Sequence, residues 1–186
     1  MRKFLLATSL LMALVSPALA VAPAKPGVLV DQLGHPVPGS ALSGHYLLVY
    51  FGYTFCPDVC PTTLKLMSDV LDRMGPEGRN VKAFFVTVDP KRDTPPVMRQ
   101  YLSHFSPRIT GLTGTPDDIA ATAAKFHVAV KPGPEGTITH GVFIYFLGPD
   151  GRLIKSFHPQ TGTGEILKEI ETELKNPTVE TSRGYQ

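Results

Sequence analysis

The sequence lacks an apolar run long enough to cross a membrane. Its longest, Phe4 to Leu19, has 16 residues and is interrupted at Pro17, whereas a spanning helix needs about 20. Two basic residues precede the run and Ala18-Leu19-Ala20 ends it, a pattern typical of a cleavable signal peptide over residues 1–20. No cysteine lies near this cut, which excludes a lipidated anchor there. An uncleaved membrane anchor is the alternative. In either case we expect the folded part outside the cytoplasm, which in a bacterium is the periplasm.

The sequence also lacks an excess of either charge. Residues 1–20 contain two of the 18 basic residues and none of the 16 acidic ones, so the rest of the chain is formally neutral. A nucleic-acid-binding protein needs a basic face, which argues against nucleic acid as a partner. The remaining length suffices for one domain with a core but not for two. We expect a flexible leader at 21–27, a folded domain at 28–175 and a disordered tail at 176–186, where apolar residues are almost absent.

One stretch organises the chain. Apolar, β-favouring residues run from Leu47 to Phe51 without polar alternation, which predicts a central strand covered on both faces. A turn and the start of a helix follow, and they hold the only two cysteines, Cys56 and Cys60. The thiols are therefore expected at the carboxyl end of a core strand and the amino end of a helix. Ligands bind at this edge in open α/β sheets.

The other elements follow from hydrophobic periodicity and turn residues. Strands are predicted at Val81–Val88, Ile109–Leu112, Val142–Leu147 and Arg152–Phe157, helices at Thr62–Met74, Pro95–Phe105, Thr115–Phe126 and Glu165–Leu174, a small edge hairpin at 28–37, and loops at 131–136 and 137–141. Parallel strands followed by an antiparallel hairpin and a helix form the thioredoxin-like plan. The expected fold class is α/β, a three-layer sandwich with a central mixed sheet, helices on both faces and an N-terminal hairpin.

Cys56 and Cys60 are separated by three residues, so one helical turn brings them onto the same face. Two thiolates make a soft, bidentate platform suited to Cu(I) or Zn. The helix amino end favours the deprotonated form that a metal needs. The same features suit thiol–disulfide exchange, so position leaves both chemistries open. A structural disulfide is the third alternative, although a loop this short restrains the unfolded chain only weakly.

A third metal ligand has to come from one of six histidines. His140 lies in the segment Thr137–Gly141, just before the third core strand, and in a thioredoxin-like layout this segment packs against the cysteine turn. Gly141 lets the backbone approach closely. The other histidines lie in early turns, late in helices or at the far end of a strand: His35, His45, His104, His127 and His158. We therefore predict that Cys56, Cys60 and His140 form a pocket fit for copper.

Several stretches resemble the Sco/SenC family. The segment from Gly52 to Leu64 is similar to the family's signature, and Val86–Pro90 with Arg92–Pro95 is similar to its second motif. Ile109–Gly114 and the His140 segment agree in order and spacing, so the resemblance covers about Val28 to Leu174. It implies a thioredoxin-like fold and one copper ion, as Cu(I) or Cu(II), bound by Cys56, Cys60 and His140. It also places Asp89 close behind these ligands.

The role that the resemblance implies is delivery of copper to the dinuclear CuA centre of cytochrome c oxidase, or reduction of that centre's cysteines beforehand. The partners would be the oxidase subunit that carries CuA and another periplasmic copper chaperone. Such a protein is not an enzyme with turnover, apart from a thiol–disulfide side activity of a Cys56–Cys60 redox disulfide. Two features depart from the family: Thr139 replaces the usual acidic residue before the histidine, and the leader looks cleavable where the family is commonly membrane-tethered.

Three hypotheses follow from this reading of the sequence. The first is a periplasmic copper metallochaperone, and the second is a thiol–disulfide reductase on the same scaffold. The third is an extracytoplasmic binding module in which Cys56 and Cys60 form a structural disulfide.

Overall fold

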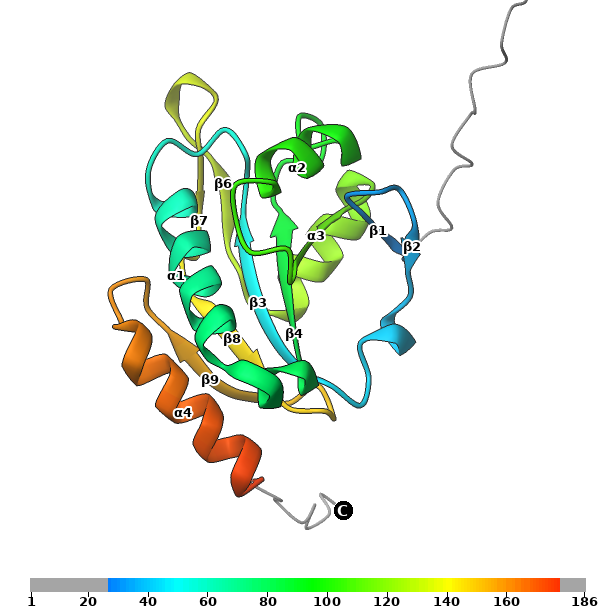
Figure 1. Ribbon diagram of the computed structural model, residues 1–186. Coiled ribbons are helices and arrows are strands. Elements are labelled where there is room, and N and C mark those ends of the chain that lie inside the picture. Colours follow the sequence, from blue (N-terminus) through cyan, green and yellow to red (C-terminus); the bar gives the residue numbers. More distant parts are fainter. Residues whose placement is uncertain (1–26, 178–186) are drawn as a thin grey trace, which may run out of the picture.

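The computed structural model describes residues 27–177. Their centre is a seven-stranded mixed sheet in the order β2-β1-β5-β4-β3-β8-β9 (Figure 1). The strands β3 (Tyr46–Gly52), β4 (Val81–Thr87) and β5 (Ile109–Thr113) are parallel. The strands β8 (Ile144–Leu147) and β9 (Leu153–Phe157) extend the sheet antiparallel on one side, and β1 (Leu29–Asp31) and β2 (Pro36–Val37) extend it on the other.

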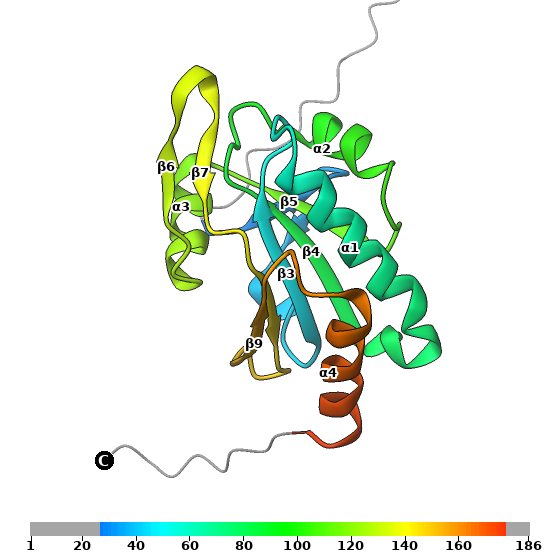
Figure 2. The same cartoon turned by 90° about the vertical axis from the view of Figure 1, so that its left-hand side faces the viewer.

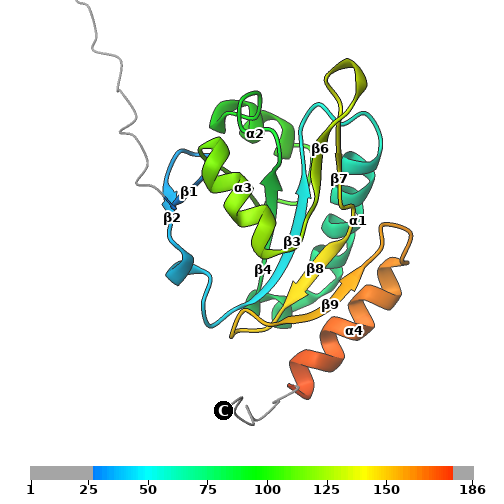
Figure 3. The same ribbon diagram turned by 180° about the vertical axis from the view of Figure 1, so that it is seen from behind.

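Helices cover both faces of this sheet. On one face lie α1 (Val59–Arg73), α2 (Pro95–Leu102) and α4 (Thr163–Lys175), and on the other lies α3 (Pro116–Lys125) (Figures 2 and 3). Short 3-10 turns occur at Gly39–Ala41, Gly75–Asn80 and Pro134–Gly136. The three layers, the mixed sheet and the N-terminal hairpin confirm the predicted fold class.

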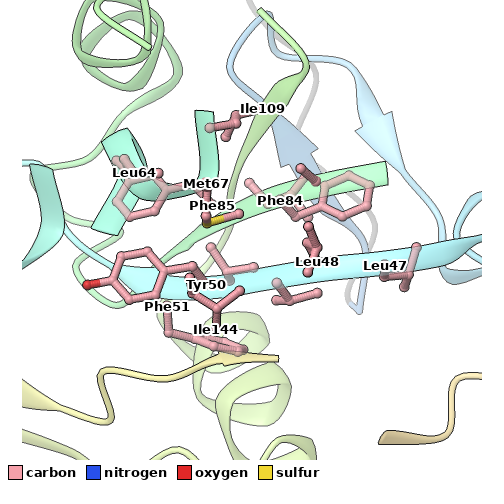
Figure 4. Packing of buried hydrophobic residues seen from close by; sticks show 14 of the residues in the cluster. Leu47, Leu48, Tyr50, Phe51, Leu64, Met67, Phe84, Phe85, Ile109 and Ile144 are labelled. Atoms are coloured by element: carbon pink, nitrogen blue, oxygen red, sulfur yellow. The ribbon is translucent and has the colours of Figure 1, made fainter. Parts of the chain in front are cut away.

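The central strand β3 packs against helices on both of its faces. Tyr50 and Phe51 are both fully buried. Tyr50 stacks on Phe85 with ring centroids 6.1 Å apart, on the side where Leu64 of α1 packs (Figure 4). Phe51 points to the opposite side, where its ring meets Phe126 at the end of α3 at 5.1 Å. Neighbouring residues are therefore buried on opposite faces, which explains why the strand shows no polar alternation.

The segment that carries His140 differs from the prediction. Residues expected in loops form a separate antiparallel hairpin of β6 (Val130–Pro132) and β7 (Ile138–His140). His140 therefore ends a strand. Hydrophobic alternation could not reveal strands this short, because β6 is exposed along its whole length and has no buried face.

The start of α1 also differs from the prediction. The helix begins at Val59, three residues before the predicted Thr62, so Cys60 and Pro61 are helical. Proline is tolerated there because the first amides of a helix have no partner within the helix. The other predicted elements are confirmed within a few residues at their ends.

None of the helices in residues 27–177 is both long and apolar enough to span a bilayer. The longest, α1, has 15 residues and is exposed on one side. The predicted signal peptide over residues 1–20, nearly all of the leader and most of the tail lie outside the described residues and stay predictions.

Candidate metal centre

The two cysteines flank the start of α1, beyond the carboxyl end of β3. Cys56 lies in the turn before the helix and is half-buried, whereas Cys60 lies in the first helical turn and is fully buried. Both are free thiols. The backbone N–H of Cys60 donates a hydrogen bond to Cys56 Sγ at 3.4 Å. The sulfur of Cys56 therefore lies at the amino end of the helix, as the sequence predicted, and it is the thiol that an incoming ion or protein can reach.

The pKa of the Cys60 thiol differs from the sequence-based expectation. Burial raises the pKa of its thiol to about 12, and a hydrogen bond with the neighbouring Cys56 adds to the rise. The prediction that the helix amino end favours the thiolate is wrong for Cys60, because loss of hydration outweighs the helix dipole at a buried sulfur. Cys60 is protonated at neutral pH. An ion that binds this sulfur therefore has to displace the proton.

His140 reaches the cysteine pair from the end of β7. Its Nε2 lies 3.8 Å from Cys60 Sγ, and its Nδ1–H donates to the carbonyl of Gly141 at 2.8 Å. Because Nδ1 carries the proton, Nε2 presents its lone pair to the sulfur. Burial lowers the pKa of His140, so the ring is neutral at neutral pH, the form that binds metals. The exposed Thr139 supplies no acid, and the Gly141 carbonyl orients the ring.

Two tyrosines from β3 and the cysteine turn pack against the imidazole. The ring of Tyr53 meets His140 edge-on at 5.8 Å, and its hydroxyl accepts a hydrogen bond from the Ile138 N–H at 3.2 Å. The ring of Tyr50 lies 6.4 Å from that of His140. Burial is the main cause of the raised pKa of the Tyr50 phenol. The neighbouring Cys60 raises this pKa further, because negative charge on its sulfur disfavours the phenolate. The turn that carries the thiols thus also supports the histidine.

A buried carboxylate fixes the cysteine turn to the end of β4. Asp93 is fully buried. It accepts hydrogen bonds from the Thr54 N–H at 3.0 Å, from the Thr54 hydroxyl at 2.6 Å and from the Thr87 hydroxyl at 2.6 Å. Sequence reasoning missed this residue, because an aspartate between loop residues and a helix start is usually exposed. The one available signal was a charged side chain inside a motif that follows a core strand.

Asp89 lies in the same loop, between β4 and α2. Its carboxylate accepts a hydrogen bond from Arg92, and Arg92 in turn donates to the carbonyl of Gly136 in the hairpin at 2.6 Å. Within residues 27–177, no hydrogen bond joins the Asp89 side chain to Cys56, Cys60 or His140. The predicted link between Asp89 and the site therefore runs through Arg92, which sequence reasoning did not single out.

The donor set consists of two thiols and one neutral imidazole. In the described part of the chain, no three His, Cys, Asp or Glu side chains are yet close enough together to hold a metal. Cys60 and His140 are already in contact, and Cys56 interacts with Cys60. Thiolate and imidazole donors suit a soft ion such as Cu(I).

The other histidines do not join this cluster. His35 lies 3.3 Å from a carboxylate oxygen of Asp31, and the ring of His158 packs against Phe143 at 5.6 Å. Within residues 27–177, His140 is the only histidine whose ring makes a hydrogen-bonding contact with a cysteine.

A thioredoxin-like sheet with a C-x3-C turn and a facing histidine defines a class of small domains that bind a metal or exchange thiols. The chain belongs to the SCO1/SenC family, whose model matches residues 22–175. An SCO2-like protein of Rickettsia felis is 35% identical over 146 residues, 75% of this chain and 71% of that protein. The human mitochondrial SCO1 homolog is 35% identical over 139 residues, 71% of this chain and 46% of that protein.

Solved structures give the same assignment. Bradyrhizobium japonicum ScoI with copper bound has a TM-score of 0.73 and 40% identity, covering 81% of this chain and 99% of that one. Yeast Sco1 with copper bound has a TM-score of 0.77 and 29% identity, covering 88% of this chain and 96% of that one. A disulfide switch has been identified in BsSco, a member of the Sco family of cytochrome c oxidase assembly proteins. It has a TM-score of 0.68 and 26% identity, over 80% of this chain and 91% of that one.

Proposed function

We propose that this protein is a periplasmic copper metallochaperone that binds one copper ion through Cys56, Cys60 and His140. It delivers the ion to the CuA centre of a cytochrome c oxidase subunit during assembly. The observation that carries the proposal is the 3.8 Å contact between Cys60 Sγ and His140 Nε2 across 80 residues of sequence. Copper-bound relatives with the same fold support it.

The three ligands have distinct roles in this proposal. Cys56 is the half-exposed sulfur, so the incoming ion meets it first and the recipient's ligand attacks the ion on that side. Cys60 binds next and releases its proton, which makes affinity depend on pH. His140 closes the site as a neutral donor, with its Nδ1–H held by the Gly141 carbonyl. Transfer then proceeds by ligand exchange, and the copper passes on without a change of its charge.

Copper binding to three variants tests the ligand assignment. The mature protein is reduced, loaded with Cu(I) and titrated against a chromophoric chelator, alongside Cys56→Ser, His140→Ala and the matched control His158→Ala. Wild type and His158→Ala should bind one copper ion each with equal affinity. Cys56→Ser and His140→Ala should bind at least about tenfold more weakly. A His140→Ala variant that binds copper as tightly as wild type would show that the imidazole is not a ligand.

A thiol–disulfide reductase is the second candidate function. The observation that favours it is the asymmetry between a half-buried Cys56 and a fully buried Cys60. The Cys56 thiolate would attack one sulfur of a partner disulfide and release the other as a thiolate. Cys60 would then lose its proton and attack Cys56, releasing the second partner thiolate and leaving a Cys56–Cys60 disulfide. The partner gains two electrons, and this chain needs an external thiol reductant to act again.

Steady turnover distinguishes the two candidates. The reductase predicts continuous reduction of a disulfide-containing CuA-domain protein by an external dithiol, without metal and with the rate set by this chain. The chaperone predicts a single transfer of copper per loaded molecule. Turnover that persists in His140→Ala and disappears in Cys56→Ser would favour the reductase.

A further inference from the structure

The hairpin that carries His140 is largely separate from the body of the fold. Its strands β6 and β7 pair with each other in a sheet of their own and project from the main sheet (Figure 2). A cleft of about 470 Å³ separates the hairpin from the segment Val88–Arg92. Near the end of the hairpin, Ile138 packs against the core and the His140 ring contacts Tyr50 and Tyr53. The rest of the hairpin is joined to the fold by the side chains that bridge this cleft.

Within residues 27–177, two hydrogen bonds join the hairpin to the rest of the fold, in addition to the contact between His140 and Cys60. Ile138, two residues before His140, donates to the Tyr53 hydroxyl. At the other end of the hairpin, Arg92 Nη2 donates to the Gly136 carbonyl. The first bond depends on the Tyr53 side chain of the cysteine turn. The second depends on one side chain from another loop.

Arg92 contacts three segments at once. Its Nε donates to the Asp89 carboxylate, and its Nη2 reaches the hairpin at Gly136. Its guanidinium carbon lies 4.8 Å from the ring centroid of Phe55, the neighbour of Cys56. Arginine presents several N–H donors in a rigid plane that also stacks on an aromatic ring, and a lysine ammonium cannot satisfy these contacts together. Arg92 thus joins the cysteine turn to the far end of the hairpin, as Tyr53 joins it to the end that carries His140.

We propose that Arg92 is a positioning residue that holds the β6–β7 hairpin, and with it His140, over the two cysteines. It raises copper affinity without touching the ion, because it increases the fraction of molecules in which all three ligands stand together. Apparent affinity falls in proportion to that fraction. Asp89 contributes to the same positioning, because its carboxylate orients the Arg92 guanidinium. The proposal rests on the proposed function, since it takes copper as the ligand of His140.

Hydrogen exchange and a double-mutant cycle test this inference. The variants of the mature chain are Arg92→Lys, His140→Ala, the double variant, and Asp89→Asn as a second way to release the guanidinium. The exposed Arg99→Lys on α2 is the matched control. Amide exchange of residues 130–140 is measured in metal-free protein, and Cu(I) affinity is measured by chelator competition. Thermal melting shows that each variant folds.

Arg92→Lys should speed exchange in the hairpin and weaken Cu(I) binding about tenfold, as changes to residues that support metal ligands do. Asp89→Asn should act in the same direction, and Arg99→Lys should do neither. In the His140→Ala background Arg92→Lys should have no further effect on copper, because the histidine it positions is gone. The proposal would be overturned if Arg92→Lys had the hairpin amide exchange and the Cu(I) affinity of wild type. It would also be overturned if Arg92→Lys lowered Cu(I) affinity equally in the wild-type and the His140→Ala backgrounds. Faster hairpin exchange in a protein that binds no copper would overturn the proposed function and leave the structural role of Arg92 standing.

Discussion

Replacing Gly52 with alanine tests the packing behind the Cys60 sulfur. Gly52 ends β3, and a Cβ atom there would lie 2.7 Å from Phe85 Cε2 and 3.0 Å from Cys60 Sγ. Carbon atoms pack best about 3.5 to 4.0 Å apart, so the added Cβ crowds the ring and the sulfur together, and relief needs shifts of roughly 1 Å. The Phe85 ring cannot yield easily, because it packs against Tyr50 at 6.1 Å and Tyr101 at 6.0 Å. The backbone at residue 52 then has to shift, and the sulfur, which the Cβ also crowds, is displaced from its place beside His140.

Overpacking of this kind costs about 1 to 3 kcal/mol. For a domain of this size, each kcal/mol lowers Tm by about 2 to 4 °C, so Gly52→Ala should melt roughly 2 to 12 °C below wild type. Cu(I) affinity should fall as well, since Cys60 and His140 no longer converge. Both are measured on residues 21–186, by thermal melting followed by circular dichroism and by chelator competition.

The matched control is Gly164→Ala in the first turn of α4, where an added Cβ meets no atom within 4 Å. Alanine favours a helix over glycine by about 0.5 to 1 kcal/mol, so this variant should melt above wild type and bind copper normally. A Gly52→Ala variant that melts with wild type and keeps its copper affinity would refute the packing argument.

Three further predictions concern the groups around the site. Asp93→Asn should lower stability by about 1.5 to 3 kcal/mol, because the Thr54 and Thr87 donors lose a charged acceptor; an unchanged melting temperature would contradict this. Tyr50→Phe should weaken Cu(I) binding, because the buried phenol interacts with the Cys60 sulfur and favours its thiolate form; an unchanged affinity would contradict this. Cu(I) affinity should rise at least about tenfold per unit from about pH 7 to 8, because the Cys60 thiol, with its raised pKa, is protonated there and must release a proton to bind. His140, with its lowered pKa, adds no proton in that range. Affinity independent of pH would mean that copper does not bind the Cys60 sulfur.

The sequence predicted the framework of the site because its strongest signals are local. An unbroken apolar run marked β3, and the C-x3-C turn placed both thiols at its carboxyl end. The place of His140 followed from topology, since the residues that lead into β8 have to lie near that turn when β8 pairs with β3. These inferences need only the hydrophobic pattern and the order of elements.

The remaining features depend on contacts between distant segments, which no local pattern encodes. Strand β6 is exposed along its whole length and β7 has only three residues, so the hydrophobic pattern of this segment predicted a loop. The bond from Arg92 to Gly136 spans 44 residues and leaves no periodic trace. The raised pKa of Cys60 reflects its burial beside groups from distant segments, Tyr50 of β3 and His140 of β7 among them. A helix-dipole argument alone gave the wrong direction, since it ignores the loss of water around the sulfur.

X-ray absorption at the copper edge of the Cu(I)-loaded mature protein, compared with His140→Ala, tests the three-ligand site most directly. The account predicts two sulfur scatterers at about 2.2–2.3 Å and one imidazole nitrogen at about 2.0 Å, close to the distances known for thiolate and histidine ligands of a similar ion. The nitrogen shell should vanish in the variant. An all-sulfur spectrum that is the same in wild type and His140→Ala would contradict it.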